Sequence, residues 1–424
     1  MSSPMMPDVE GLWMREEQAP DLTAHRASDR RGGSFLRYHP RRLAERMVPL
    51  IDADTMEKVA DASVAVARTA HQLRQRPVAI LHATLLRSES ISSSWVEGLR
   101  ETPRNIMVAQ LRERDPGLAG HQFDRLRTAS SILANLNSVR DGVELLRAPW
   151  THDAIHAIHR TIAPAVHDDG YRVQDVQIGG SSKLTASYAA PPAAEVPWLM
   201  DDLLTYANVS PDAPLVKSAI IHAQFETVHP YEDGNGRAGR VLVHGYLARA
   251  GVLDHGVLPL SVVLRRDVDE YVRRLMAYRH ASDDDRPGAV AQFVDYFADC
   301  LVDSCEETDR VMAESEEVRA DWADRVSGYR SDSAVHRALP VVADQPVLTA
   351  RYLASALGVS TVTGRRVVDQ LLDAGIVEPS GGRFNRSEVY QASALLRMMD
   401  RLVPGIQPTA LPRPRPVRPD EAGS

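Results

Sequence analysis

Twelve consecutive residues near the middle of the chain, His229 to Arg240, combine the side chains that phosphate chemistry needs. Two glycines flank Asn235, and glycine lets a backbone turn tightly and approach a ligand closely. A helix is expected to begin near Gly236, and the unpaired N–H groups and dipole of a helix start favour an anion. Arg237 and Arg240 share one face of that helix, where guanidinium groups match phosphate oxygens. The segment therefore predicts a polyphosphate site.

Two further side chains of this segment indicate what the site does with a phosphate. Asp233 would repel an anion unless it holds Mg²⁺, which bridges carboxylate and phosphate oxygens. His229 ends the preceding helix, and a neutral imidazole can take a proton from a hydroxyl group. Each feature alone has an ordinary explanation, such as a helix cap, a turn or a solvated arginine face. Their occurrence within twelve residues favours a site at which a hydroxyl attacks a nucleotide phosphorus.

The segment 229–240 resembles the signature of the Fic (filamentation induced by cAMP) family, His-Pro-Phe-x-Asp/Glu-Gly-Asn-Gly-Arg-x-x-Arg. The one departure is Tyr231, where phenylalanine is usual. That position packs under the loop in the family, so tyrosine fits if its hydroxyl finds a partner. The preceding residues 222–228 also resemble the helix that leads into the family signature.

The resemblance implies a mainly α fold with a β-hairpin flap, and transfer of AMP from ATP to a Ser, Thr or Tyr hydroxyl of a protein, which could be the chain itself. It makes His229 the general base and Asp233 the Mg²⁺ ligand. The residues that it assigns to the phosphates are Gly234, Asn235, Gly236 and Arg237, with Arg240 facing the γ-phosphate. The flap corresponds to about residues 177–188, including Ile178, Gly179 and Gly180, and would hold a target segment by strand addition.

A second match lies upstream, where residues 89–98 resemble the inhibitory helix of the family. Ser93 and Glu97 are four residues apart, so both point the same way from a helix. A carboxylate there could pair with Arg240 and occupy the γ-phosphate position, and inhibition would be intramolecular. The alternative is an ordinary surface glutamate before a glycine that ends a helix.

The chain organisation expected from the sequence has six parts. They are a poorly ordered arm over 1–38, a helical region over 39–140 with the inhibitory helix at about 88–98, a Fic core over 141–310, a helical connector over 311–335, a separate unit over 336–402 and a Pro- and Arg-containing tail over 403–424. Within the core, Gly- and Pro-punctuated runs between 171 and 192 predict the hairpin. Thr151 and Thr349 are expected helix caps.

The unit over 336–402 reads as helix, short turn, helix and hairpin, which is typical of a winged helix-turn-helix. Four arginines could contact DNA, two on the second helix and two in the wing: Arg365, Arg366, Arg383 and Arg386. Nearby acidic residues dilute this charge. DNA binding and packing against protein therefore both stay open.

Composition limits the remaining possibilities. The net charge of -8 argues against a chain devoted wholly to wrapping nucleic acid. Cys300 and Cys305 lie without a His/Cys cluster at zinc spacing. We find no signal-peptide pattern and no apolar run that could span a bilayer, so we expect a cytoplasmic protein with no membrane partner. A homodimer is plausible because many members of the family self-associate.

Two alternative functions remain at this point. The same loop could serve a Fic enzyme that transfers another phosphate-containing group or removes AMP, because the loop fixes an anion and a metal without naming the transferred group. The chain could instead be a DNA-binding regulator with a Fic core as sensor. An intact His229 argues against the regulator, since a sensor could do without a base.

Overall fold

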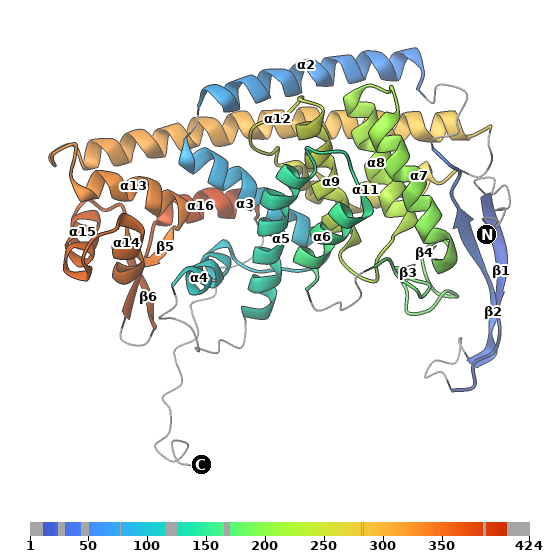
Figure 1. Cartoon of the computed structure of the whole chain (residues 1–424), viewed down its shortest axis with the longest axis horizontal. Helices are drawn as coiled ribbons and strands as arrows, with labels where there is room; N and C mark the ends of the chain where they lie inside the picture. Colours follow the sequence, from blue (N-terminus) through green and yellow to red (C-terminus); the bar gives the residue numbers. More distant parts are fainter. Residues whose placement is uncertain are drawn as a thin grey trace. The chain divides into compact units, whose positions relative to one another are not determined.

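The computed structural model describes residues 12–23, 30–43, 51–76, 78–115, 126–164, 170–280, 282, 284–384 and 387–404, and most of them are helical (Figure 1). The mainly α fold class predicted from the sequence is therefore confirmed. The chain divides into two compact units. The first comprises Met1–Pro77, Ser88–Leu99 and Ala134–Asp309, and the second comprises Val78–Arg87, Arg100–Leu133 and Arg310–Ser424.

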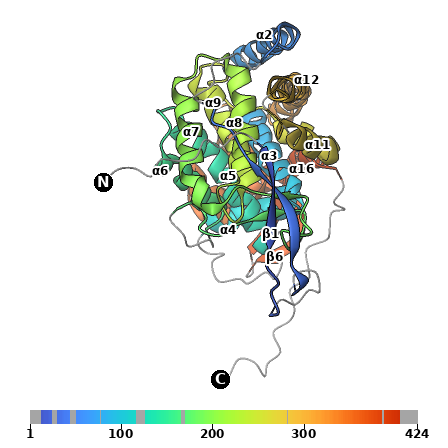
Figure 2. The same cartoon turned by 90° about the vertical axis from the view of Figure 1, so that its right-hand side faces the viewer.

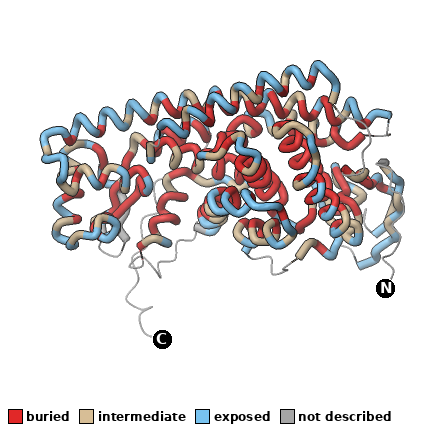
Figure 3. Tube along the Cα trace, turned by 45° about the horizontal axis from the view of Figure 1, so that its top comes forward, coloured by how far each residue is buried: buried red, intermediate tan, exposed pale blue. Residues whose placement is uncertain are grey.

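The first unit is built around two helices that are buried along almost their whole length, α8 (Pro214–Val228) and α9 (Asn235–Arg249) (Figure 3). Their buried residues include polar and charged side chains, among them Glu226, Arg237 and Arg240, as well as apolar ones. The other helices of this unit are α2 (Ala53–Gln75), α6 (His152–Ile162), α7 (Val196–Val209), α10 (Leu260–Leu264) and α11 (Val268–Tyr278), with short 3-10 turns at Ala193–Glu195 and Arg265–Asp267. The core helices thus present the loop 229–234 between them.

Three helices contribute residues to both units: α3 (Ala79–Val96), α5 (Leu126–Leu145) and α12 (Arg286–Arg325). The helical connector expected over 311–335 is the continuation of α12 as far as Arg325, and α13 then starts at Ala334. The sequence contains neither glycine nor proline between residues 289 and 325, so nothing interrupts the helix there. A helix long and apolar enough to cross a bilayer does not occur in the described part of the chain.

A four-stranded sheet of the first unit has the strand order β1-β2-β4-β3. β1 (Leu12–Gln18) and β2 (Gly33–His39) form a long antiparallel ribbon (Figures 1 and 2), and β2 pairs in parallel with β4 (Tyr188–Ala189). β4 pairs with β3 (Gln177–Ile178) as the short hairpin predicted between residues 171 and 192.

The poorly ordered arm predicted over residues 1–38 needs correction, because residues 12–18 and 33–39 form the strands of that ribbon. Trp13 packs against Tyr38 and Tyr188, with ring centroids 5.3 and 6.2 Å away. Trp13 Nε1 also donates a hydrogen bond to the Arg279 carbonyl at 3.0 Å. The partners of the ribbon lie far along the chain, so its own polar composition did not reveal them. The remainder of residues 1–38 includes positions outside the described residues.

The second unit contains α4 (Pro103–Arg114), α13 (Ala334–Asp344), β5 (Val347–Thr349), α14 (Ala350–Leu357), α15 (Thr361–Asp373), β6 (Glu378–Phe384), β7 (Ser387–Gln391) and α16 (Ser393–Leu402). The order of elements from α14 to β7 follows the one predicted, and Thr349 caps α14 as expected. The winged helix-turn-helix assignment stays a prediction. Residues 336–402 share their unit with α4, whose Arg104 donates to the Gln391 side chain at 2.9 Å. The tail is outside the described residues from 405 onward.

Candidate active site

The loop between α8 and α9 is held in shape by its own residues. α8 ends at Val228, and His229 follows in the left-handed region with φ 49°, while Gly234 precedes α9 with φ 82°. Asn235 closes the loop on Tyr231, accepting from its N–H at 2.9 Å and donating to its carbonyl at 2.8 Å. The Asn235 side chain is thus occupied within the loop. What this residue can offer to an anion is its backbone N–H in the first turn of α9.

The tyrosine that replaces the usual phenylalanine has the partner that it requires. The Tyr231 hydroxyl lies 2.8 Å from His156 Nδ1, and its ring stacks on His159 at 3.6 Å between centroids. His159 in turn donates from Nε2 to the Asp233 carbonyl at 2.8 Å. These two histidines of α6 contact the loop through Tyr231 and the Asp233 carbonyl. We did not single them out from the sequence, although their spacing of three residues places them on one helix face.

Asp233 and Arg237 lie side by side at the start of α9. One Asp233 carboxylate oxygen accepts from the Gly234 N–H at 2.7 Å, and the other is 3.4 Å from Arg237 Nη2. The Asp233 side chain is 73% exposed, whereas that of Arg237 is 4% exposed. Mg²⁺ is commonly bound by one or two carboxylates together with substrate phosphates. A single exposed carboxylate beside a predicted phosphate site fits that pattern, and the described residues contain no cluster of three metal-binding side chains.

The predicted inhibitory residues meet Arg240. Its Nη2 is 2.8 Å from Glu97 Oε1 and 2.8 Å from the Ser93 carbonyl, and its Nε donates to the Ser93 hydroxyl at 2.9 Å. The Arg240 side chain is 1% exposed, and its Nη1 is buried without a hydrogen-bond partner. Burial lowers the pKa of this guanidinium, but Glu97, Tyr271 and Glu226 together raise it, and the pKa ends above its ordinary value.

The Glu97 carboxylate also lies against Gly236, in the first turn of α9. A Cβ placed on Gly236 would be 1.8 Å from Glu97 Oε1 and 3.0 Å from Arg240 Nη1. Only glycine therefore allows the carboxylate to approach the start of α9 this closely. The carboxylate occupies the position beside the helix start at which an anion is expected.

The segment that carries Ser93 and Glu97 is anchored by polar contacts within the first unit. Glu89, which is buried, accepts from the Ser261 N–H at 2.7 Å and from the Ser261 hydroxyl at 2.6 Å, and lies 3.1 Å from His244 Nε2. Asn135 donates to the Ser90 carbonyl at 2.9 Å. These contacts fix the end of α3 beside α9.

His229, the predicted base, is half-buried at the end of α8. Burial, together with the positive charges of Arg279 and Arg172, lowers the pKa of its imidazole to about 3. The side chain is therefore neutral near pH 7, which is the state in which an imidazole accepts a proton.

The predicted flap residues lie at the tip of β3. Ile178 is partly exposed, and its carbonyl accepts from the Ser187 N–H at 2.9 Å. Gly179 has φ 72°, and a Cβ on Gly180 would be 2.5 Å from the Thr185 carbonyl oxygen, so the turn requires both glycines. β2 covers one side of β4, which leaves β3 as an edge strand of the described sheet.

The arginines considered for DNA binding are less available than the sequence suggested. Arg365 is 2.9 Å from Glu388 and 3.3 Å from Asp369, so two carboxylates already neutralise it. Arg366 is exposed on α15. The side chain of Arg383 and the whole of Arg386 lie outside the described residues. DNA binding stays a prediction without further support.

Residues 149–247 match the Fic/DOC family. A Fido domain-containing protein of Dictyostelium discoideum is 30% identical over 110 residues, which are 26% of this chain and 71% of that protein. A probable protein adenylyltransferase of Aquifex aeolicus is 37% identical over 86 residues, which are 20% of this chain and 25% of that protein. The chain belongs to the Fic family. Its match to the Aquifex relative spans only a quarter of that protein's length.

Among solved structures, a Fic family protein from Desulfovibrio desulfuricans is similar, with 23% identity and a TM-score of 0.49. The match covers 81% of this chain and 96% of that chain.

Proposed function

We propose that this chain is an autoinhibited protein adenylyltransferase that transfers AMP from ATP to a Ser, Thr or Tyr hydroxyl of a protein. The observation that carries the proposal is the placement of His229 at the end of α8, only five residues (230–234) before the N-terminus of α9, where an anion is expected. The name of the Aquifex relative, a probable protein adenylyltransferase, supports AMP as the transferred group.

In this reaction His229 accepts the proton of the target hydroxyl as the hydroxyl oxygen attacks the α-phosphorus of ATP, and pyrophosphate leaves. The backbone N–H groups at the start of α9 and the Arg237 guanidinium bind the phosphates. Asp233 is the residue that would hold Mg²⁺, which neutralises charge on the phosphate oxygens when bound. Target hydroxyls would be presented along the free edge of β3.

Glu97 supplies the inhibition in this proposal. Its carboxylate engages Arg240 at 2.8 Å, so a γ-phosphate that needs the same guanidinium has to displace it. A carboxylate also repels a phosphate placed beside Gly236. The enzyme is therefore expected to be largely inactive until the contact between Glu97 and Arg240 is broken.

Labelled ATP tests the transfer. With Mg²⁺ present, label in the α-phosphate should become attached to protein in the Glu97→Gly variant, and the His229→Ala change in the same variant should abolish it. Attachment of label from the γ-phosphate alone would overturn AMP transfer in favour of phosphoryl transfer. Undiminished α-labelling after His229→Ala would remove the proposed base.

A further inference from the structure

The last three carbonyl groups of α8, those of Glu226, Thr227 and Val228, each accept from a side chain outside the helix. The last four carbonyls of any α-helix lack partners within it. Arg279 Nη2 donates to the Glu226 carbonyl at 3.4 Å, and the Tyr188 hydroxyl donates to the Thr227 carbonyl at 2.7 Å. The next two carbonyls, those of Val228 and His229, accept from a single side chain, that of Arg172.

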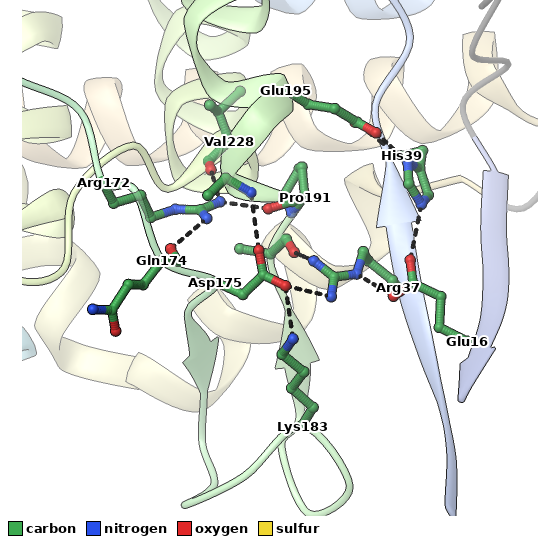
Figure 4. A network of polar contacts seen from close by, with 12 residues as sticks. Glu16, Arg37, His39, Arg172, Gln174, Asp175, Lys183, Pro191, Glu195 and Val228 are labelled. Atoms are coloured by element: carbon green, nitrogen blue, oxygen red, sulfur yellow. Dashed lines mark hydrogen bonds and ion pairs between the residues drawn. The ribbon is translucent and has the colours of Figure 1, made fainter. Parts of the chain in front are cut away.

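Arg172 bonds to backbone carbonyls at the end of α8 and on both legs of the flap, and Figure 4 shows its contacts with Val228, Gln174 and Pro191. Its Nε donates to the His229 carbonyl at 2.8 Å and its Nη2 to the Val228 carbonyl at 3.3 Å. The same guanidinium donates to the Gln174 carbonyl before β3 at 3.0 Å and to the Pro191 carbonyl after β4 at 2.6 Å. The Arg172 N–H adds a bond to the Pro230 carbonyl at 2.9 Å.

The backbone conformation of His229 explains why such support is needed. His229 is the one non-glycine residue with positive φ in the described part of the chain, at 49°. This conformation disfavours an ordinary side chain by about 1 kcal/mol or more, and it persists only where the surroundings enforce it. The side chain of Arg172 is almost fully buried, so its four carbonyl contacts are shielded from water.

We propose that Arg172 is a positioning residue for His229, which fixes the imidazole at the end of α8 and couples its orientation to the flap that receives the target. This inference rests on the proposed role of His229 as the general base. Arg172 does not touch the reacting atoms; it acts through the backbone of His229 and through its charge. The charged groups around the imidazole are Arg172 itself and Arg279, which follows α11, with the neutral Tyr188 hydroxyl of β4 beside them.

A second buried arginine provides a matched control. Arg37 of β2 bonds the flap in a similar way, donating to the Ala190 carbonyl at 3.1 Å and pairing with Asp175 at 2.9 Å (Figure 4). Its polar contacts in the described part of the chain are with Glu16, Asp175 and Ala190, and not with His229. Arg37→Gln should therefore disturb the flap without changing the surroundings of the imidazole.

The test is a titration of His229 by NMR in the Glu97→Gly background, with the resonance assigned by its loss in His229→Gln. In Arg172→Gln the imidazole pKa should rise by about one pH unit or more, because a facing positive charge is lost. Arg37→Gln should leave the titration as in the parent. Arg172→Lys keeps the positive charge but loses the planar guanidinium with its several donors, so the pKa of the His229 imidazole should stay low.

Kinetics separate positioning from stability. Arg172→Gln and Arg172→Lys should both lower kcat by roughly 10- to 100-fold, with KM for ATP changed by less than about threefold, because the phosphate site is intact. An unchanged imidazole titration and an unchanged kcat in folded Arg172→Gln would overturn the inference. If that variant does not fold, an unchanged kcat in Arg172→Lys overturns it. The NMR titration does not depend on catalysis. If the Glu97→Gly parent transfers no AMP, that result contradicts the proposed function, and the titration still tests the role of Arg172.

Discussion

Replacing Glu97 by glycine should activate the enzyme by an amount that the structure sets. A hydrogen bond to a charged group contributes about 1.5–3 kcal/mol. Arg240 is 1% exposed, but Glu97 is 35% exposed, so we take the lower part of this range, about 1.5–2 kcal/mol. ATP no longer has to break this contact in Glu97→Gly. At about 1.4 kcal/mol for each factor of ten, productive binding of ATP should improve about 10- to 30-fold.

The initial rate of α-labelling, measured below saturating ATP, is the assay for this change. Glu97→Gln is the matched control, since its amide keeps the shape and one acceptor oxygen but not the charge. Its rate should lie between those of the natural chain and Glu97→Gly. A folded Glu97→Gly variant that labels no faster than the natural chain would refute the inhibitory role of the contact between Glu97 and Arg240.

Three further predictions follow from the same site. Ser93→Ala removes the 2.9 Å hydrogen bond from Arg240 Nε, so the labelling rate should rise by roughly fivefold, which is less than in Glu97→Gly. A larger rise than in Glu97→Gly would contradict this ranking. Asp233→Asn should raise the Mg²⁺ concentration needed for half-maximal labelling at least about tenfold, and an unchanged requirement would exclude Asp233 as the ligand. Burial raises the pKa of Glu226 from 4.5 to about 7, so the native state binds this proton more tightly than the unfolded chain. The free energy of unfolding should therefore fall by up to about 3 kcal/mol between pH 4.5 and 7. Urea denaturation of Glu226→Gln should show a smaller fall over the same pH range. An equal fall in the variant and the natural chain would contradict this prediction.

The candidate site residues that could be named from the sequence are those that belong to a local pattern. The loop 229–240 and the pair Ser93 and Glu97 owe their recognition to fixed spacings, and the structure brings both sets together at Arg240. The condition set for Tyr231 could also be stated in advance, because a buried hydroxyl requires a partner. The identity of that partner, His156, could not, since it depends on how α6 packs under the loop.

The residues that sequence reasoning missed act on backbone groups or on distant partners. Arg172 and Arg279 bind carbonyl oxygens, which every residue has, so no side-chain pattern reveals the contact. The ribbon of β1 and β2 was missed because Trp13 and Tyr38 become buried only against Tyr188, about 150 residues later in the chain. Contacts of this kind are set by tertiary packing rather than by local propensity.

Mass spectrometry of modified peptides tests the central claim most directly. Glu97→Gly should be incubated with ATP, Mg²⁺ and a protein extract, beside a Glu97→Gly/His229→Ala control, and the adducts should be weighed and located. The account predicts an adduct with the mass of AMP on Ser, Thr or Tyr that is absent from the control. An adduct of any other mass, or an AMP adduct that persists without His229, would contradict it.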